Sequence, residues 1–532
     1  MNRRNFLLNF LLWILLFIFG YRVGNSDIKS DVLSEELAEI AYQLNPNMTT
    51  KEIQSALDTY NNFIWNSGVY NVNPIFLKSN SYHKFAPNVT IMANSGFLER
   101  DCLINVIGQE NVFIDFNNAV LQMRYDDYTI GEWRHCLNIQ GSKNIKINDV
   151  LMKDSGGDGL YIGANGDGNY SENVITDNIE IDHCRRQGIS IASGKNINIV
   201  NTKISNIIGA NPQFGVDIEP NNPLDVIEKI FISNIETNNC AGGGISIALQ
   251  GLAYSQYHTT NENNYVDIHI DNFKSNGDKY GISLNPTQYR VNGTCNFKNV
   301  SIINSKANGI LGVSWYTSKT PKVTIEKCDV INPNSNNATG DVLGSGIVFY
   351  NPSGLSEQIG NIVFKDVFIK DDRGVSQLKN GLYSLNLLST YSVDIVIDNF
   401  NVTGETGKAI TVYGSIRDIG KFKPLIRNLT ASNLYNGNID YKNVITNSGA
   451  TTDITASLDF LTVGEIGEFK VETSFYFKIK PYKTTDLLYP DITGGNKYLR
   501  SNKVGSSVKI KKVATDKYMV IEQIGVWETL TL

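Results

Sequence analysis

Two acidic residues on alternate positions of one short strand are the first candidates for chemistry in this sequence. They are Asp217 and Glu219, in the stretch FGVDIEPNNP. Alternate side chains of an extended strand share a face, so their Cβ atoms lie about 7 Å apart. Side-chain rotation can bring the carboxyl groups to the spacing of about 5 to 9.5 Å found in two-carboxylate hydrolytic sites. Repulsion between them raises one pKa, which places a proton donor beside a base.

A similar strand earlier in the chain carries cationic and amide side chains instead. In CRRQGISIAS, Arg185, Arg186 and Gln187 precede Gly188, and a guanidinium can hold a carboxylate or phosphate through two parallel hydrogen bonds. Asp158 in GGDGLYIG stands directly before its own glycine, and we expect it to assist the two acids. The other residues that we expect to bind substrate beside these strands are His183, Tyr161, Gln213 and Gln250.

Each of these residues also has a structural interpretation. Acids on an exposed strand face commonly serve solubility, either arginine can pair with Asp154 or Asp158, and His183 can bond a turn carbonyl. The GGDG and NGDG sequences are weak calcium signals, because they lack the repeating nonapeptide of calcium-binding β-solenoids. The clustering of acids and arginines nevertheless favours a functional role.

The elements that position these residues follow a repeat. A glycine followed by alternating apolar residues recurs at intervals of 27 to 37 residues, and a second strand of the type Asn-Ile-x-Ile precedes each copy. No helical periodicity intervenes. Short strands with one apolar face bury that face when successive coils stack about 4.8 Å apart, so the sequence predicts an all-β parallel β-helix. The repeated glycines are Gly159, Gly188, Gly215, Gly244, Gly281, Gly309, Gly346 and Gly381.

Aligning the coils on these glycines predicts which side chains share the outer surface. One row contains Tyr161, Ser190, Asp217, Ser246 and Ser283, and the next contains Gly163, Ala192, Glu219, Ala248 and Asn285. The two acids then lie on the floor of a shallow trough between small neighbours. We expect the insert 248–264 to arch over this trough and to present Gln250, Tyr254, Tyr257 and His258.

The chain divides into four segments. Residues 1–26 contain Arg3 and Arg4 before an apolar run, which predicts an export signal of twin-arginine type or a retained transmembrane anchor. Residues 27–85 form a helical cap and the first strands, with Thr49 or Thr50 capping a helix. Residues 86–450 form the β-helix, and 451–532 form a β-rich module in which SSVKIKKVATDKYMVIEQIGVWETLTL is antiparallel.

Composition narrows the class of protein. The 532 residues carry a net charge of −6 and no basic run beyond the first few residues, which argues against a nucleic-acid partner. Six cysteines have no zinc-type spacing. Cys184 and Cys240 occupy the same position two coils apart, too far for a disulfide, so we expect reduced core cysteines.

The coils, together with IQSALDTYNNFIWNSGVYNVNPIFLKSNSYHKFAPNVTI, resemble the pectate-lyase-like superfamily over about residues 50–450. The resemblance implies a right-handed single-stranded parallel β-helix with an N-terminal capping helix and a small C-terminal β-module. Tailspikes that digest surface polysaccharide share this layout, which implies a homotrimer formed through the C-terminal module. GGDGLYIG before RQGISIAS is similar to the polygalacturonase pair of an Asp-rich and a His-Gly strand, with Gln187 in place of the histidine and no later Arg-x-Lys motif. FGVDIEP resembles the mannuronan epimerase pattern Tyr-Gly-x-Asp-Pro-His at Gly215 and Asp217.

Together these observations predict an exported or surface-anchored enzyme that cleaves an extended anionic polysaccharide. Hydrolysis by Asp217 and Glu219, assisted by Asp158, is the first hypothesis and requires no cofactor. A lyase or epimerase is the second, with Arg185 or Arg186 as base and calcium held by the paired acids. The third is a non-catalytic glycan-binding spike. The membrane is a partner only through residues 1–26.

Overall fold

The computed structural model describes most of the chain after residue 40. The described residues are 41–166, 168–253, 264–352, 357–386, 394–413, 426–428, 444–446, 451–458, 466–480, 487–489, 497–514 and 516–531. The predicted export segment 1–26 lies outside them, as do Tyr254, Tyr257, His258 and the Asp of NGDG. Within these described ranges, no helix has the length and apolar character needed to cross a bilayer.

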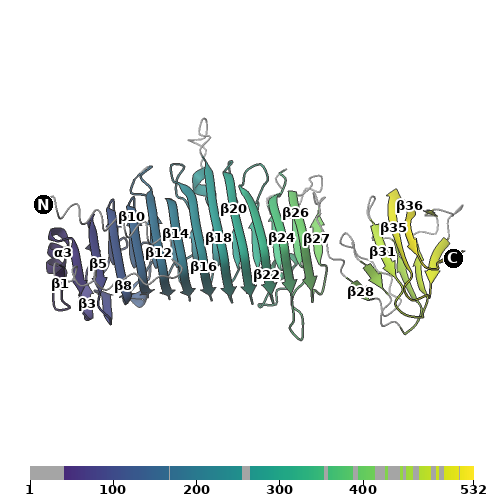
Figure 1. The fold of residues 1–532 in the computed structure, drawn as a ribbon, viewed down its shortest axis with the longest axis horizontal. Coiled ribbons are helices and arrows are strands. Elements are labelled where there is room, and N and C mark those ends of the chain that lie inside the picture. Colours follow the sequence, from purple (N-terminus) through teal and green to yellow (C-terminus); the bar gives the residue numbers. More distant parts are fainter. Residues whose placement is uncertain are drawn as a thin grey trace, which may run out of the picture.

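Each coil contributes one long and one short strand to two parallel sheets (Figure 1). The long-strand sheet has the order β1 (Tyr42–Leu44), β2 (Asn62–Trp65), β5 (Ser81–Phe85), β8 (Glu110–Gln122), β10 (Lys143–Lys153), β12 (Ser171–Asp182), β14 (Gly194–Ser205), β16 (Ile227–Asn238), β18 (Tyr265–Asn276), β20 (Asn292–Ile303), β22 (Lys322–Ile331), β24 (Gly360–Lys370) and β26 (Asp394–Thr403), with β3 (Gly68–Val72) and β6 (Val89–Ala93) attached near its start.

The short-strand sheet runs beside it in the same coil order. It consists of β4 (Ile75–Phe76), β7 (Ile104–Ile107), β9 (Leu137–Gln140), β11 (Leu160–Gly163), β13 (Ile189–Ile191), β15 (Phe214–Ile218), β17 (Gly243–Ile247), β19 (Ile282–Leu284), β21 (Ile310–Val313), β23 (Ile347–Asn351), β25 (Leu382–Asn386) and β27 (Ile410–Tyr413). Short helices η1 (Tyr125–Asp127), η2 (Leu249–Ala253) and α4 (Asp341–Gly344) lie in the connections.

The register of the short strands confirms the predicted outward row. Tyr161 pairs with Ser190, Ser190 with Asp217, and Asp217 with Ser246. Ser246 pairs in turn with Ser283. The chain is therefore a right-handed parallel β-helix, as predicted. Residues 23 to 37 positions apart in sequence become nearest neighbours along the helix axis.

The repeated glycines are required by close packing at one corner of each coil. A Cβ atom on Gly188 would lie 2.5 Å from Ile204 Cγ2 in the core and 2.5 Å from the Gly215 carbonyl oxygen of the next coil. Any larger residue would push the coils apart or displace the core isoleucine. The glycine column thus aligns the coils, and the isoleucines on either side of it fill the interior.

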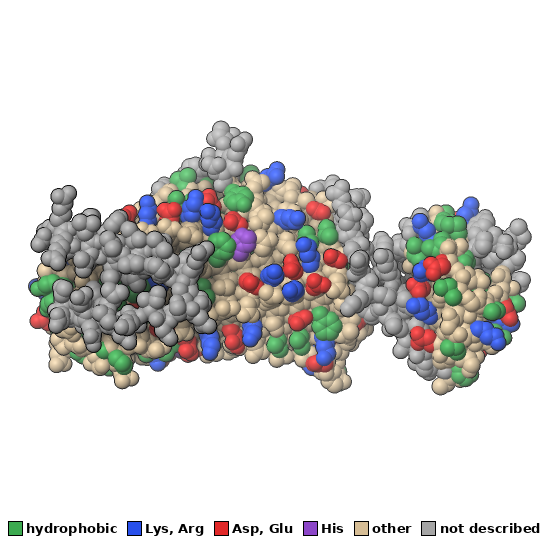
Figure 2. Space-filling view, viewed as in Figure 1, with side chains coloured by type: hydrophobic (Ala, Val, Ile, Leu, Met, Phe, Trp, Pro, Cys, Tyr) green, Lys and Arg blue, Asp and Glu red, His purple; other side chains and the backbone are tan. Residues whose placement is uncertain are grey.

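The outer face of the long strands carries charges of both signs. In register, Glu180 lies beside Lys203, Lys203 beside Glu236, and Glu236 beside Lys274. Figure 2 shows acidic and basic side chains interspersed over the face in view. Opposite charges on directly adjacent strands attract each other, whereas a row of like charges would repel.

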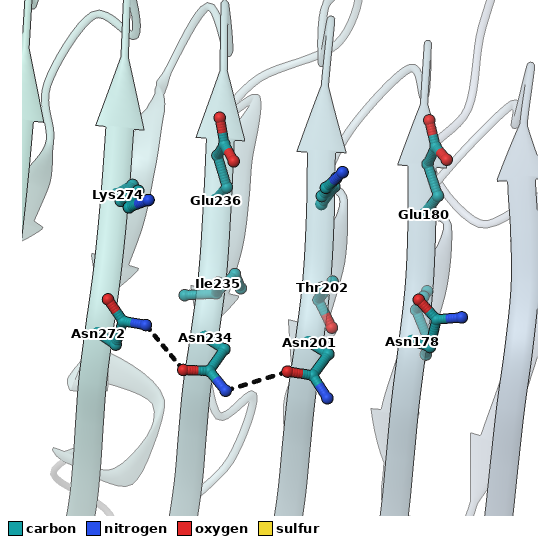
Figure 3. Close-up of a pocket in the computed structure, with 11 residues that line it drawn as sticks. Asn178, Glu180, Asn201, Thr202, Asn234, Ile235, Glu236, Asn272 and Lys274 are labelled. Carbon is teal, nitrogen blue, oxygen red and sulfur yellow. Dashed lines mark hydrogen bonds between the residues drawn. The ribbon is translucent and has the colours of Figure 1, made fainter.

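Asparagines bend the long strands in the middle. Asn201 and Asn234 have φ of 51° and 54°, the left-handed conformation that asparagine tolerates better than most residues. The Asn234 amide donates to Asn201 Oδ1 at 3.0 Å, and the Asn272 amide donates to Asn234 Oδ1 at 2.7 Å (Figure 3). This ladder gives these asparagines a structural role.

The N-terminal cap is a helix that starts where the sequence indicates. The helix α3 spans Thr50–Thr59, with Thr49 as N-cap in a capping box with Glu52. Tyr42–Leu44, within the segment predicted as helical cap and first strands, is the strand β1 although its apolar spacing is helical. Leu44 is fully buried and this strand pairs in parallel with β2, so sheet pairing overrides the local helical pattern.

The C-terminal module has its own hydrophobic core, in which Phe469, Phe477, Ile510 and Tyr518 are buried. One sheet has the order β28 (Ile426–Asn428), β29 (Val444–Thr446), β31 (Ile466–Lys470), β35 (Ser507–Ala514), β36 (Lys517–Ile524) and β33 (Leu487–Tyr489). The other contains β30 (Ile454–Ser457), β32 (Phe477–Lys480), β34 (Lys497–Ser501) and β37 (Glu528–Thr531). The predicted antiparallel pairing is confirmed for β35 and β36.

All six cysteines are buried and free, as the repeat predicted. Burial raises the pKa of the Cys184 and Cys240 thiols well above the ordinary value. Such thiols are protonated and inert at neutral pH, so these cysteines act as small core residues.

We expect the asparagine ladder to contribute measurably to stability. Asn201→Ala removes the hydrogen bonds to Asp177 and Asn234 and places alanine at φ 51°. It should lower the free energy of unfolding by about 2 kcal/mol. Asn201→Gly removes the same hydrogen bonds but tolerates the backbone, and should cost about 1 kcal/mol. Urea denaturation measures both, and equal losses would contradict the role of the left-handed backbone.

Candidate functional site

Three carboxylates from neighbouring coils surround one guanidinium. Arg186 Nη2 lies 3.0 Å from Glu219 Oε2, and Arg186 Nη1 lies 3.7 Å from Asp158 Oδ1. Asp217, on the same coil as Glu219, also acts electrostatically on Arg186. We call Asp158, Arg186, Asp217 and Glu219 the carboxylate cluster. The structure thus brings together the acids and one of the two arginines that the sequence singled out.

The coil register explains this convergence. Asp158 and Arg186 stand just before the glycines of two successive coils, and the Arg186 amide donates to the Gly157 carbonyl at 3.0 Å. Asp217 and Glu219 lie one coil further on, within and directly after β15. Alternation along the strand turns both acids away from the core isoleucines, toward the Arg186 side chain.

Gln187 sets the orientation of Asp217. Its Oε1 accepts a hydrogen bond of 2.6 Å from the Phe214 amide, which leaves Nε2 to donate to Asp217 Oδ2 at 2.6 Å. Gln187 is fully buried. In the structure it therefore holds a carboxyl group in place, whereas the sequence suggested that it binds substrate.

The three acids of the cluster differ in how far they are buried. Asp158 is 0% and Asp217 1% exposed, while the Glu219 side chain is 38% exposed. Burial raises the pKa of Asp158 to about 7, although the Arg186 guanidinium opposes this shift. Burial and the Glu219 charge raise the pKa of Asp217 well above its ordinary value. The cluster therefore places two buried acids with raised pKa values beside Glu219, which solvent reaches.

The predicted shallow trough with both acids on an open floor is wrong. Asp217 does point outward from the strand, but Gln187 bonds one of its oxygens and it is 1% exposed. The long side chains of the preceding coil extend toward this carboxyl group, and the sequence pattern alone gave no indication of their direction. Only Glu219 lines an open surface.

The sequence interpretation missed His135, which touches the cluster from the coil before Asp158. The Asp158 amide donates to His135 Nδ1 at 2.9 Å, so Nδ1 carries no proton. Burial and the nearby Arg186 lower the pKa of His135 to about 3, which keeps the ring neutral. Its ring stacks on Tyr161 at 4.9 Å between centroids, and burial raises the pKa of that tyrosine.

Residues 123–135 form a wall beside the cluster, and the sequence analysis did not identify this segment as part of the site. Glu132 Oε2 lies 3.2 Å from Arg186 Nε, and Trp133 packs edge-on against Tyr161 at 5.9 Å. The coil that carries this wall continues into CLNIQ without the repeated glycine, so the search for that glycine did not find it. Extending the outward row backwards from Tyr161 to its partner Asn138 would have found it.

The glycines of GGDG have a steric function. A Cβ atom on Gly157 would lie 2.5 Å from the Glu132 carbonyl oxygen, and one on Gly156 would lie 2.4 Å from the Tyr128 ring. These glycines let the wall approach the strand that carries Asp158. In the described part of the chain, no group of three or more His, Cys, Asp or Glu side chains converges as a metal site. A calcium role stays a prediction.

The remaining predicted binding residues have their contacts elsewhere. His183 Nδ1 pairs with Asp154 at 2.8 Å, and Arg185 donates to the Thr129 carbonyl at 2.7 Å. Gln213 accepts from the Gly209 amide, and Gln250 accepts from the Gln288 amide at 2.8 Å. These bonds brace loops beside the cluster, and a role in substrate binding stays a prediction for all four.

A groove of about 300 Å³ runs along the outer face of the long-strand sheet, across β12, β14, β16 and β18 (Figure 3). It follows the bend made by the asparagine ladder, and Glu180, Glu236 and Lys274 stand beside it. None of the residues of the carboxylate cluster lines it. The ladder amides already bond one another, so the groove is a consequence of the bend.

Comparison with known proteins extends the description of the fold. No protein-family model matches the chain. YclG, an uncharacterised protein of Bacillus subtilis (strain 168), is 27% identical over 296 residues, which cover 51% of this chain and 48% of that protein. The chain thus matches about half the length of this relative.

Solved structures with similar folds have different functions. The exopolygalacturonase of Thermotoga maritima has a TM-score of 0.48 at 13% identity, over 70% of this chain and 96% of that one. The Streptococcus pneumoniae surface protein and adhesin PfbA has a TM-score of 0.42 at 14% identity, over 71% and 100%. A shared fold does not transfer function or site residues.

The burial of Asp158 makes stability depend on pH in a definite direction. Its pKa is about 7 in the folded chain, above its ordinary 3.8, so folding favours the protonated form. The contribution of Asp158 to the free energy of unfolding is fully present below about pH 4 and is lost as the pH rises to about 7. Asp158→Asn should melt like the unsubstituted chain near pH 4 and at a higher temperature at pH 8. Scanning calorimetry at both values tests this, and a lower melting temperature of the variant at pH 8 would contradict it.

Proposed function

We propose that the chain is a polysaccharide-cleaving enzyme of the glycoside hydrolase type, acting on an extended anionic glycan that lies across the coils. The observation that carries the proposal is the convergence of Asp158, Asp217 and Glu219 on Arg186. A cluster of three acids, two of them fully buried, is costly because burial penalises each charge. Such arrangements are typical of functional sites. Such a cluster supplies both forms of a carboxyl group at one place.

Glu219 is the carboxylate that substrate reaches directly, and we assign it the role of base or nucleophile. Arg186 Nη2 contacts it at 3.0 Å and fixes its position. Asp158, with a pKa of about 7, is the better-matched proton donor near neutral pH. Asp217 assists from below as a buried, protonated neighbour. This exchanges the roles that the sequence suggested for the two aspartates.

The geometry accommodates a glycosidic bond between the two groups. Asp158 and Glu219 contact nitrogens of one planar guanidinium, so the contacting oxygens lie no more than about 9 Å apart. That limit covers both the spacing of about 5 Å in retaining and about 6.5 to 9.5 Å in inverting hydrolases. Substrate reaches Asp158 when it displaces Glu132, the exposed partner of the largely buried Arg186.

The electrostatics disfavour elimination with arginine as base. Burial by itself would lower the pKa of Arg186. The charges of Asp158 and Glu219 raise it, and together with the other nearby acids they outweigh the effect of burial, so the pKa lies above its ordinary value. A general base must lose its proton near the working pH, and this guanidinium does not. Arg186 instead fits the role of a permanent cation that binds and polarises.

A non-catalytic glycan-binding role is the second candidate. The near-complete burial of Asp158 and Asp217 favours it, because a substrate touches neither acid unless the covering side chains move. Export of the chain, its anchoring at a surface and a homotrimer are consistent with either function and stay predictions.

The products of digestion separate these candidates. Incubation with uronate polysaccharides should release reducing ends without absorbance at 235 nm, because hydrolysis creates no unsaturated sugar. Absorbance at 235 nm would indicate a lyase. Retained binding with neither signal would indicate a binding protein or an epimerase, and either would overturn the proposal.

Substitutions test the assigned carboxylates. Glu219→Gln, Asp158→Asn and Asp217→Asn should each lower kcat by at least about a hundredfold, because each removes a proton-transfer group or its immediate neighbour. Glu110→Gln is the matched control, since Glu110 is exposed on β8 outside the cluster. Melting temperatures confirm folding. Unimpaired turnover of Glu219→Gln would remove it from the mechanism.

The pKa of Asp158 also predicts the alkaline limit of activity. The protonated acid predominates below its pKa of about 7, so kcat/KM should fall as the pH rises above that value. Arg186→Gln removes the cation that lowers the pKa of Asp158, so the alkaline limit of activity should move to higher pH. An alkaline limb that does not move in this variant would show that another group acts as the acid.

A further inference from the structure

We propose that Trp133 and Arg100 form a binding subsite for one acidic sugar residue, beside the carboxylate cluster. The inference rests on the proposed function, because it adds a neighbouring sugar position to the same site. Neither Trp133 nor Arg100 was among the site residues predicted from the sequence. It follows from the way in which two loops meet next to Arg186.

The wall is fixed to a second loop, residues 97–100. Arg134 is buried and donates from Nε to the Phe97 carbonyl at 3.2 Å and from Nη1 to the Ile130 carbonyl at 2.6 Å. Its guanidinium also lies over the Tyr128 ring, 4.9 Å from the centroid. A charged group with backbone acceptors on both loops fixes residues 97–100 relative to 130–134.

Trp133 belongs to this wall and packs against His135, which contacts Asp158 of the cluster. Its ring meets the rings of His135 and Tyr161 edge-on, at 6.0 and 5.9 Å between centroids. The Cys102 thiol contacts the Trp133 carbonyl at 3.2 Å, which holds the backbone. The adjacent residue, Glu132, reaches Arg186 at 3.2 Å. The half-buried indole is therefore fixed, and its neighbour Glu132 contacts the same guanidinium as Glu219.

Arg100 supplies an available positive charge. Its guanidinium carbon lies 5.5 Å from the centre of the Trp133 ring, and the residue is exposed. Across the described ranges, no carboxylate forms an ion pair with it, although Arg186 has three carboxylates around it. A guanidinium that rests on an aromatic ring is free to bind an anion from outside.

These two groups together select one kind of ligand. An indole offers a flat apolar surface to the C–H face of a pyranose ring, and Arg100 binds a carboxylate on that sugar. A uronic acid residue carries both features. Because the wall precedes the cluster along the coil axis, this sugar lies next to the one whose glycosidic bond is cleaved.

Binding to matched polymers tests the subsite apart from catalysis. The probes are polygalacturonate and polymannuronate, each with its carboxyl-reduced neutral derivative, and affinity electrophoresis with the full chain carrying Glu219→Gln measures binding without turnover. Arg100→Ala should weaken binding of the preferred acidic polymer about tenfold and leave the neutral derivative unchanged. Trp133→Ala should weaken binding of both forms, because it removes the stacking surface.

Conservative variants separate a binding role from a structural one. Arg100→Lys and Trp133→Phe should retain most of the affinity, and melting temperatures show whether any variant is misfolded. Failure to bind either acidic polymer, or Arg100→Ala and Trp133→Ala variants that fold and bind unchanged, would overturn the subsite. Arg100-dependent binding with no turnover by the unsubstituted chain would instead overturn the proposed hydrolysis alone, and leave the subsite standing.

Discussion

The hydrogen-bonded, in-register stacking of parallel strands is the constraint on which the rest of this molecule depends. Each coil pairs with the next through main-chain bonds, so residues some 30 positions apart in sequence become direct neighbours. The glycine column and the asparagine ladder help to align successive coils. Any acid or arginine placed at one position of the repeat therefore has predictable neighbours.

The carboxylate cluster exploits this stacking at an energetic cost. Asp158 and Asp217 are buried beside Glu219, and burial raises the pKa of both aspartates. Arg186 offsets part of the repulsion, and Gln187 supplies a fixed donor to Asp217. The scaffold does not need a charge at the position of Asp217, since the neighbouring coils hold serine there. Perturbed acids that gather around one cation are typical of a functional site.

The wall at residues 123–135 shows how a regular solenoid acquires an irregular surface. It leaves the repeat, returns across the following coils, and comes close enough to the Asp158 strand that only glycine fits at Gly156 and Gly157. Its polar and aromatic residues then stand beside groups from later coils. A site of this kind combines the precision of the stacked strands with side chains from a loop.

By itself, the sequence determined the parallel β-helix, the rows of outward residues and the meeting of Asp158, Arg186 and Asp217, because a repeat converts spacing in sequence directly into spacing in space. It also determined the capping helix, through the Thr49–Glu52 pair. Tertiary structure alone decided that Tyr42–Leu44 is a strand, that Gln187 turns to Asp217, and that His135 and Trp133 reach the cluster. Long side chains and loops follow no period, and their positions depend on what packs against them. The pattern of a sequence therefore specifies where backbones lie, whereas burial and charge at the site depend on contacts that only the folded chain contains.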